Sequence, residues 1–505
     1  MPYVSRRAVL KGAAGLAALP LLGCSPRVRT PIPADPFTLG VASGEPAAGG
    51  VVLWTRLAPD PLADDGLGGM PARAVDVEWE VADDEAFTRI TQRGVVTATP
   101  VSAHSVHVEL TGLNPGAEYF YRFRTGGDIS PAGRTRTAPE ASSLAPMTMC
   151  FASCSHFEQG WFTAYRHLAE EDPDLVLQLG DYQYEYGARD GGVRAHVGPE
   201  TVTLANYRQR YAQYKSDPDL QAAHAAAPWL VVFDDHELEN NWADEIPEKP
   251  ASDFLARRAA ALQAYYENMP LRSSAIPRGI DMQLYRRVGW GRLATFHMLD
   301  TRQYRTDQPC GDTFRADCAG RFDPSATLTG ADQERWLLNG FRESRARWDL
   351  LGQQVFFAGV ELKEGPATGV NPDAWDGYVA NRDRIIAGLV DSPVRNAVVL
   401  TGDVHSHWAA EISQRPGTPS IATELVTTSI SSGGDGGDTR EDTAAILPEN
   451  PHVKYFSNRR GYVRTRIAPE QVTADFRTVP YVTRPGAPVQ TGKSFVIPDG
   501  VPQLT

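Results

Sequence analysis

Short apolar runs that end in chemically reactive side chains recur along the chain. Residues 147–152 form one such run before Cys154, and residues 174–179 form another before Asp181, with a helical pattern over residues 160–171 between them. This order predicts a strand, a helix and a second strand. In a parallel sheet, the loops beyond the carboxyl ends of strands are free of ladder hydrogen bonds and can direct side chains at a ligand. We therefore predict a site that contains Cys154, Asp181 and Tyr184.

Two later apolar runs end in the same way. Residues 229–233 lead into Asp-Asp-His-Glu at positions 234–237, and residues 397–400 lead into Asp403 and His405. The alternative for residues 234–237 is a solvated helix start, because Asp caps helices well and acidic side chains suit the first turn. That alternative does not account for the histidine at position 236. The strand ends together predict a single crevice lined by ligand-type side chains.

Several carboxylates in one crevice repel each other unless cations are bound, so these residues predict metal ions. A set with thiolate, phenolate, imidazole and carboxylate groups suits trivalent iron better than zinc, and the remaining oxygen donors suit calcium, magnesium or manganese. Two metals bridged by Asp181 would hold a hydroxide and clamp a phosphoryl oxygen for in-line displacement at phosphorus. His236 would protonate the departing alkoxide, a step that general acids accelerate by roughly 10² to 10⁴-fold.

The chain before this region has a different pattern. Between residues 37 and 137, short β-type runs alternate with turn residues without a helical pattern, which indicates a β-sandwich. Residues 111–123 resemble the fibronectin type III pattern, in which a Leu-x-Pro-Gly turn leads to a corner tyrosine. A stretch rich in Ala, Ser and Pro at residues 138–146 marks a boundary. We predict an amino-terminal sandwich domain over residues 31–140 and a catalytic domain over residues 145–505.

Further elements follow from periodicity in the second domain. Arg302 follows a predicted hairpin at residues 284–299; it could bind a phosphate bidentately or form a structural ion pair with neighbouring acids. Cys310 and Cys318 bracket a loop and could pair, which an exported protein permits. Predicted helices span residues 204–215, 254–268 and 329–345, and predicted strands span residues 354–360, 397–400, 461–467 and 472–479.

Residues 1–30 resemble an export signal. A positively charged Ser5-Arg6-Arg7 region precedes an apolar stretch at residues 12–23, as in a twin-arginine signal peptide. The Leu-Leu-Gly-Cys sequence that ends at Cys24 also resembles a lipobox, in which Cys24 would carry a lipid; plain cleavage that removes Cys24 is the alternative. Because no later run reaches the ~18 apolar residues of a membrane span, we expect a soluble or lipid-anchored protein in the periplasm, at the cell surface or secreted.

The composition limits the classes of partner. The 505 residues are enough for two or three domains, and a hydrophobic fraction of 42% is typical of a globular protein. The formal net charge of −13 gives no support to nucleic-acid binding, which needs a basic face. The sequence therefore predicts a globular protein without a nucleic-acid-binding signature.

Six short motifs carry the candidate side chains, and together with the sandwich they extend over residues 37 to about 480. Their order and coverage make the pattern highly specific. They are Phe-Ala-Ser-Cys-Ser at 151–155, Leu-Gly-Asp-Tyr-Gln-Tyr-Glu at 179–185, Asp-Asp-His-Glu at 234–237 with Asn240-Asn241, Leu-Asp-Thr-Arg at 299–302, Thr-Gly-Asp-Val-His at 401–405 and Asn-Arg-Arg-Gly-Tyr at 458–462.

In this order the motifs resemble those of the alkaline phosphatase D (PhoD-like) family of metallophosphoesterases. The resemblance implies an α/β (α+β) metallophosphoesterase-type β-sandwich flanked by helices, preceded by a smaller all-β, fibronectin type III-like sandwich domain. It also implies a calcium- and iron-dependent phosphomonoesterase or phosphodiesterase, exported by the twin-arginine machinery and used to release inorganic phosphate. By position, Cys154, Asp181, Tyr184 and His405 would hold Fe³⁺; Asp181, Asp235, Asn241 and Asp403 would hold Ca²⁺, with Asn240 as the alternative to Asn241 and Asp234 as a further candidate ligand; and His236 would be the acid near the leaving group. Asp235 and Arg302 are further candidates for direct action on the substrate.

One alternative belongs to another class of protein. The chain could be a surface-exposed binding protein whose metals are structural and whose sandwich recognises the partner. The intact Asp235-His236 pair speaks against it, because a purely structural site has no use for an acid beside an open metal position. The choice among monoesters, diesters, lipids and polymers depends on the loops at residues 187–203, 300–327 and 363–378.

Overall fold

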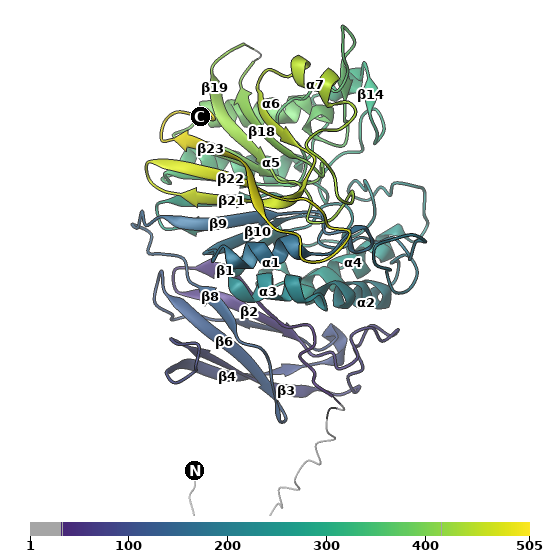
Figure 1. The fold of residues 1–505 in the computed structure, drawn as a ribbon, viewed down its shortest axis with the longest axis vertical. Coiled ribbons are helices and arrows are strands. Elements are labelled where there is room, and N and C mark those ends of the chain that lie inside the picture. Colours follow the sequence, from purple (N-terminus) through teal and green to yellow (C-terminus); the bar gives the residue numbers. More distant parts are fainter. Residues whose placement is uncertain (1–31, 33, 416) are drawn as a thin grey trace, which may run out of the picture. The chain divides into compact units, whose positions relative to one another are not determined.

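The computed structural model describes residue 32 and residues 34–415 and 417–505. The predicted signal peptide at residues 1–30, with Cys24, lies outside the described residues. Within the described ranges, no helix is both long and apolar enough to span a membrane. The described chain contains two large β-sheets, helices that flank them and a smaller β-sheet (Figure 1).

The larger sheet has nine strands and contains the strand–helix–strand unit predicted before Asp181. Its four central strands, β9, β10, β11 and β1, pair in parallel, so their carboxyl ends meet at one edge of the sheet. Its strand order is β23 (Gln490–Pro498), β22 (Gln471–Val479), β21 (Arg460–Ile467), β9 (Met147–Ala152), β10 (Leu175–Leu179), β11 (Pro228–Val232), β1 (Val41–Ala47), β2 (Gly50–Arg56) and β5 (Ser105–Glu109).

The second sheet has seven strands and carries the strand that leads to Asp403. Its strands β13, β15, β17 and β19 are also parallel. The predicted hairpin at residues 284–299 is confirmed as β12 and β13, which form its antiparallel edge. The strand order is β12 (Arg286–Trp290), β13 (Ala294–Met298), β15 (Trp348–Gly352), β17 (Ala397–Thr401), β19 (Ser420–Val426), β18 (His407–Ser413) and β20 (Val453–Ser457).

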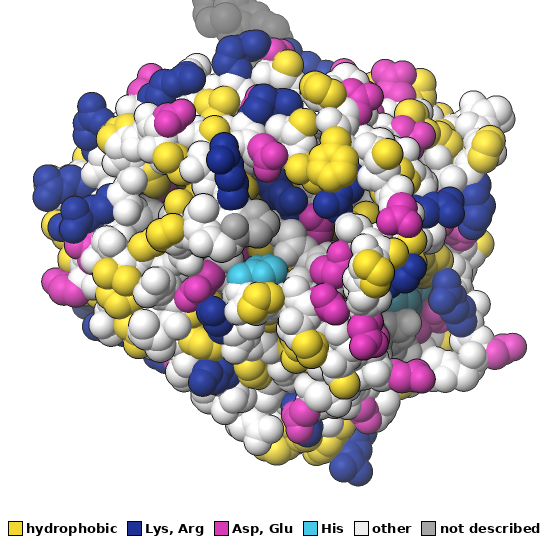
Figure 2. Space-filling view, turned by 90° about the horizontal axis from the view of Figure 1, so that it is seen from above, with side chains coloured by type: hydrophobic (Ala, Val, Ile, Leu, Met, Phe, Trp, Pro, Cys, Tyr) yellow, Lys and Arg dark blue, Asp and Glu magenta, His cyan; other side chains and the backbone are white. Residues whose placement is uncertain are grey.

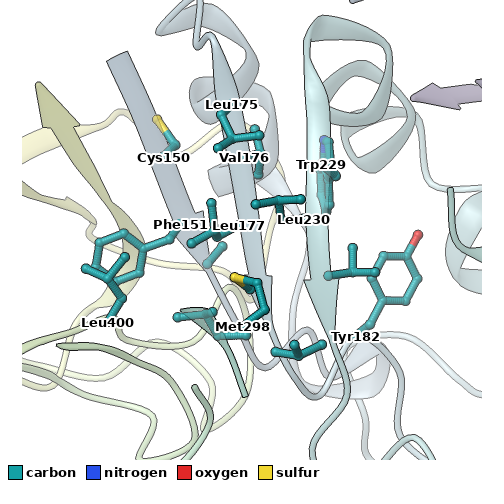
Figure 3. Packing of buried hydrophobic residues seen from close by; sticks show 14 of the residues in the cluster. Cys150, Phe151, Leu175, Val176, Leu177, Tyr182, Trp229, Leu230, Met298 and Leu400 are labelled. Carbon is teal, nitrogen blue, oxygen red and sulfur yellow. The ribbon is translucent and has the colours of Figure 1, made fainter. Parts of the chain in front are cut away.

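Alternate residues of β17 face two different cores. Val398 and Leu400 belong to the core between the two sheets, whereas Val399 belongs to the core on the opposite face. A two-residue period is expected of a strand that is buried on both faces. Figure 3 shows side chains of β9, β10 and β11 beside Met298 and Leu400 of the second sheet. The two sheets therefore pack as a sandwich around a shared apolar core.

Helices cover the outer faces of this sandwich. α1, α3 and α4 contact strands of the nine-stranded sheet. α5 and α6 contact each other and add Phe341 and Ile385 to the outer core of the seven-stranded sheet. The helices predicted at residues 204–215 and 254–268 are confirmed as α2 and α4. The bounds are α1 (Thr163–Glu170), α2 (Leu204–Lys215), α3 (Pro218–Ala226), α4 (Phe254–Asn268), α5 (Gly330–Glu343), α6 (Val379–Val390) and α7 (Thr443–Glu449).

The amino-terminal region forms a sandwich that shares strands with the nine-stranded sheet. β1, β2 and β5 lie at the edge of that sheet, and Val51 of β2 packs in one core with Val77 of a separate five-stranded sheet. Tyr119, the predicted corner tyrosine, accepts a hydrogen bond of 3.0 Å from the Asn114 backbone N–H. The domain boundary predicted at residues 138–146 stays a prediction. The smaller sheet consists of β3 (Val75–Ala82), β4 (Ile90–Ala98), β6 (Glu118–Thr125), β7 (Asp128–Ile129) and β8 (Gly133–Arg136).

The strand predicted over residues 354–360 is wrong. The strand in this region is β15, which ends at Gly352. Beyond it, the Gln354 side chain donates hydrogen bonds to two backbone carbonyls, and the backbone N–H groups of Phe357 and Ala358 donate to the buried carboxylate of Glu424. Side chains thus satisfy the backbone that a neighbouring strand would otherwise pair with. A further short pair, β14 (Arg315–Ala316) and β16 (Gly369–Val370), joins two of the loops that follow.

Candidate metal centre

The predicted ligands share an uncommon backbone conformation. Residues other than glycine rarely adopt a positive φ, because the side chain crowds the backbone, and such residues collect at functional sites. Sharp turns of this kind follow β9, β10, β11 and β17, and they bring the ligands to one edge of the sandwich. The φ angle is 61° at Cys154, 54° at Asp181, 53° at Asn241, 62° at Asp403 and 52° at His405.

Four of the predicted ligands form one group, which we call the thiol–phenol group: Cys154, Asp181, Tyr184 and His405. Ligand atoms of Cys154, Asp181 and His405 lie within 4.8 Å of one another. The Tyr184 hydroxyl donates to Asp181 Oδ2 at 2.9 Å and lies 3.1 Å from His405 Nε2. Ser432 Oγ donates to the same hydroxyl at 2.7 Å. The structure thus brings together all four residues assigned to iron by the resemblance.

The second set, which we call the carboxylate group, contains Asp181, Asp235, Asn241 and Asp403. Ligand atoms of Asp181, Asp235 and His236 lie within 4.8 Å of one another, so Asp181 belongs to both groups. The Asn241 backbone N–H donates to Asp235 Oδ2 at 2.8 Å, and Asn241 Nδ2 donates to the Asp312 carbonyl at 3.2 Å. Because the amide nitrogen is engaged there, its oxygen is left as the ligand atom.

The electrostatics of the site fit bound cations. Burial raises the pKa of Asp181 well above its usual value, with a further increase from Asp235, and burial and Asp234 do the same for Asp403. Burial and Asp181 likewise raise the pKa of the Cys154 thiol. Among the described residues, Asp181 Oδ1 is buried and accepts no hydrogen bond. A cation would offset the repulsion among these groups and provide a partner for that oxygen.

His236 is held beside both groups by a residue whose role the sequence did not indicate. Its Nδ1 lies 2.8 Å from Glu185 Oε2, and its ring packs on Tyr184 at a centroid distance of 4.2 Å. Burial opposes protonation of His236, but Glu185, Asp235 and Asp181 outweigh burial and raise its pKa well above the usual value. Glu185 closes the Leu-Gly-Asp-Tyr-Gln-Tyr-Glu motif, and that position was the only signal of its importance. Glu185 and Tyr184 therefore fix the orientation of the His236 ring.

Glu237 links the ends of β10 and β11. Its carboxylate accepts hydrogen bonds from the backbone N–H groups of Asp181, Tyr182 and Asp234, at 3.0, 2.7 and 2.9 Å. Burial raises the pKa of Glu237 to about 8. Glu237 is the last residue of the Asp-Asp-His-Glu stretch expected to line the crevice, and it binds the backbone that positions Asp181.

Arg302 forms the structural ion pair, which is one of the two roles expected from the sequence, and its direct action on the substrate stays a prediction. Its side chain is fully buried, and its Nη1 and Nη2 donate to the two oxygens of Asp373 at 3.0 and 2.8 Å. Its Nε donates to Asp234 Oδ1 at 2.6 Å. The guanidinium is therefore paired with carboxylates on both sides, which favours a positioning role. Asp373 is 71 residues away in the sequence, so no local motif indicates this partner.

Two further histidines, His407 and His156, lie close to the site or to its supporting core, and the two loop cysteines are joined. His407 Nδ1 accepts the Thr428 N–H at 3.1 Å within the core, so its role is structural. His156 stacks on Tyr184 at a centroid distance of 4.3 Å, behind the thiol–phenol group. Cys310 and Cys318 form a disulfide with their Cα atoms 5.9 Å apart. Figure 2 shows a hollow with histidine at its edge, on a face where basic and acidic side chains are interspersed.

Comparisons with known proteins agree with this geometry. Residues 149–476 match the PhoD-like phosphatase family, and residues 23–139 match the PhoD-like phosphatase N-terminal domain. The chain is 51% identical over 472 residues to alkaline phosphatase D of Bacillus subtilis (strain 168), an alignment that covers 91% of this chain and 80% of that protein. A solved structure of PhoD is 50% identical, with a TM-score of 0.90, and covers 93% of this chain and 91% of its own. The purple acid phosphatase PPD1 from yellow lupin (Lupinus luteus) seeds, at 13% identity, a TM-score of 0.54 and coverage of 91% of this chain and 73% of its own, shares the fold alone.

Proposed function

The chain belongs to the PhoD-like phosphatase family, and on this premise we propose that it is an exported phosphatase and phosphodiesterase that depends on Fe³⁺ and Ca²⁺. The family, the metallophosphoesterase-type fold and the phosphoric ester hydrolase activity expected from the sequence are confirmed by the comparisons. We propose in addition the identities of the metals, the roles of the individual residues and the compartment.

One observation carries the assignment of the site: Asp181 belongs to both ligand clusters. Its Oδ2 accepts from Tyr184, while its buried Oδ1 has no hydrogen-bond partner among the described residues. Two adjacent cations need such a shared carboxylate to offset their mutual repulsion. The donor types of the two clusters also differ, which supports two different metals.

The thiol–phenol group would hold Fe³⁺, and the carboxylate group would hold Ca²⁺. Bound there, the metals would supply Lewis-acid stabilisation of phosphoryl charge and make hydroxide available at neutral pH. The side chains of the protein then have separate tasks. Cys154 and Tyr184 provide soft and phenolate donors from inside the core, whereas Asp235, Asn241 and Asp403 provide hard oxygens from the loops.

His236 would act as the general acid. Glu185 would accept the hydrogen on Nδ1, so in the protonated ring the second proton would lie on Nε2, from which it can pass to the leaving-group oxygen. Glu185 also accepts the Asn240 N–H at 3.0 Å, which connects the acid to the loop that carries Asn241. His236 thus protonates the departing alcohol, and Glu185 orients it.

Arg302 would position the carboxylate group without touching the substrate. It joins Asp234 to Asp373 and lies 3.8 Å from Asp235. Burial raises the pKa of Asp235, but His236 and Arg302 outweigh burial and lower it below the usual value. Asp235 is therefore kept ionised, which is the state that a metal ligand requires.

Hydrolysis of two esters tests this function. The full-length protein, loaded with iron and calcium, should hydrolyse p-nitrophenyl phosphate and bis-p-nitrophenyl phosphate, and the release of p-nitrophenol measures both reactions. Removal of calcium should stop turnover, and its return should restore it. If the metal-replete protein hydrolyses neither ester, the proposed function is wrong and a binding protein with structural metals becomes the better interpretation.

We further propose that residues 1–30 direct export by the twin-arginine machinery, with Cys24 as a lipid anchor, and that the enzyme releases inorganic phosphate outside the cytoplasm. The positively charged pair and the apolar stretch support this proposal. Replacing Arg6 and Arg7 together by lysine should retain the protein in the cytoplasmic fraction. Unchanged export of that variant would contradict the route.

A further inference from the structure

A groove adjoins the metal centre on the side of Asp403 and His405. It encloses about 310 Å³, a volume in the range of small-molecule sites. Apart from those two residues, its walls are mainly apolar and include Phe356, Val360 and Trp408, which are almost fully buried. We call this the Trp408 groove. Because two predicted metal ligands line it, the groove lies next to the place where a phosphate ester would bind.

One basic side chain, Arg440, lines this apolar groove. Its side chain is 32% exposed, and its guanidinium lies 5.9 Å from the Trp408 ring centroid. Nε lies 3.3 Å from Asp442 Oδ1, but neither Nη1 nor Nη2 donates a hydrogen bond to any of the described residues. These two nitrogens are therefore available to an anionic group.

The acidic residue that also lines the groove does not neutralise Arg440. Asp376 Oδ1 accepts from Arg382 Nη1 at 2.8 Å, and its Oδ2 accepts the Val360 backbone N–H at 2.8 Å. Both oxygens of Asp376 are thus engaged away from Arg440, and Asp403 is the carboxylate that the proposed function assigns to a metal ion. The groove therefore combines an apolar body with a single site for negative charge.

We propose that the Trp408 groove binds the alcohol half of the ester and selects alcohols that combine an apolar ring with a negatively charged group. The ring would lie against Phe356 and Trp408, and the anionic group would pair with Arg440. This inference rests on the proposed function, because the groove can select a substrate only if Asp403 and His405 border the reacting phosphate. The loop at residues 363–378, one of the three expected from the sequence to influence the choice of substrate, contributes Asn371 and Asp376 to the lining.

Two substrates that differ only in charge test Arg440. 4-Carboxyphenyl phosphate and 4-carbamoylphenyl phosphate have similar shapes, but only the first carries an anionic group on its ring. In the metal-replete Arg440→Gln variant, the ratio of kcat/KM for the carboxylate to that for the carboxamide should fall about tenfold, mainly through KM, because a charge-assisted hydrogen bond is lost. Arg335→Gln, a matched change at an exposed arginine outside the groove, should leave the ratio as in the wild type. An unchanged ratio in Arg440→Gln would overturn the assignment of Arg440.

A second variant tests the apolar wall. Leu362 also lines the groove and is partly exposed, so Leu362→Trp should fill space without disturbing the core. It should lower kcat/KM for phenyl phosphate about tenfold relative to methyl phosphate, whose alcohol does not reach the wall. If Leu362→Trp lowers kcat/KM equally for the two esters, the alcohol does not bind in the Trp408 groove. If the wild-type protein hydrolyses none of these esters, the proposed function itself is wrong. If it hydrolyses them but the variants leave the kcat/KM ratios unchanged, only the role assigned to the Trp408 groove is wrong.

Discussion

The two ligand groups of the metal centre differ in how the fold holds them. In the thiol–phenol group, Cys154, Asp181 and Tyr184 are at most 2% exposed and Tyr184 bonds directly to Asp181. In the carboxylate group, Asn241 and Asp403 are partly exposed. His405 of the first group is also partly exposed, and Asp235 of the second is buried, so the contrast lies between Cys154 and Tyr184 on one side and Asn241 and Asp403 on the other.

The loops around Asn241 show how a partly exposed ligand is held. Asn241 donates through Nδ2 to the Asp312 carbonyl, inside the loop closed by the Cys310–Cys318 disulfide. Its own carbonyl accepts from Gln308 Nε2 at 2.9 Å. Ligands held by such outer contacts bind a metal less tightly when the contacts are removed. We therefore expect the metal of the carboxylate group to exchange and the metal of the thiol–phenol group to persist.

The largest effect should come from the residue that the two groups share. Asp181→Asn should lower turnover on the order of 10⁴-fold, because it removes the bridging charge on which both metals depend. Elemental analysis should show loss of both metals, while Asp332→Asn at an exposed position should retain them. An Asp181→Asn protein that keeps one iron and one calcium per chain would show that Asp181 does not join the groups.

His236→Gln should come next, with a loss of about 10²- to 10³-fold for an alkyl ester. The loss should be much smaller for p-nitrophenyl phosphate, because that leaving group needs little protonation. Both metals should stay bound, since His236 is assigned to proton transfer and not to coordination. Equal losses for the alkyl and p-nitrophenyl esters would argue against its role as the acid.

Tyr184→Phe separates the two groups spectroscopically. The iron-loaded wild type should absorb in the visible range through a tyrosinate-to-iron transition, and the variant should lose that band together with about 10²-fold of its activity. Tyr186→Phe, two residues away, should keep the colour. A colourless wild type with iron bound would mean that the ligand set is wrong.

Asn241→Ala should affect the carboxylate group alone. Loss of a ligand oxygen from a partly exposed loop should weaken calcium binding about tenfold, while the visible band of the iron stays. Calcium titration of activity, followed alongside the absorption spectrum, measures both. Loss of the band in this variant would show that the two groups are not independent.

The smallest effect should follow removal of the disulfide. Changing Cys310 and Cys318 together to serine should raise the calcium concentration needed for half-maximal activity about threefold, because the loop that holds Asn241 loses a restraint. Iron content should not change. If iron binding changes, or if the calcium requirement does not, the disulfide loop does not specifically support the carboxylate group.

Much of the site could be predicted because its ligands come from local patterns. Each strand end is visible as an apolar run followed by polar residues, and in a parallel sheet such ends share one edge. The strand at residues 354–360 was predicted wrongly, and the partner of Arg302 was not predicted at all. The strand expected at residues 354–360 has its backbone bonded to Glu424 instead, and Arg302 is engaged by Asp373. Both partners lie far along the chain, where periodicity carries no information about them.

The sequence by itself determined which side chains are available to metals and the order of the strands that present them, because strand periodicity and the residues after each strand are local properties. Only the tertiary structure decided which of these side chains meet and what each one does there. Tyr184 and His405 are 221 residues apart and lie 3.1 Å from each other, and Glu185 holds His236 from 51 residues away. Hydrogen bonds and burial depend on distance in space, so the contacts that join the ligands within each group form only when the two sheets pack together.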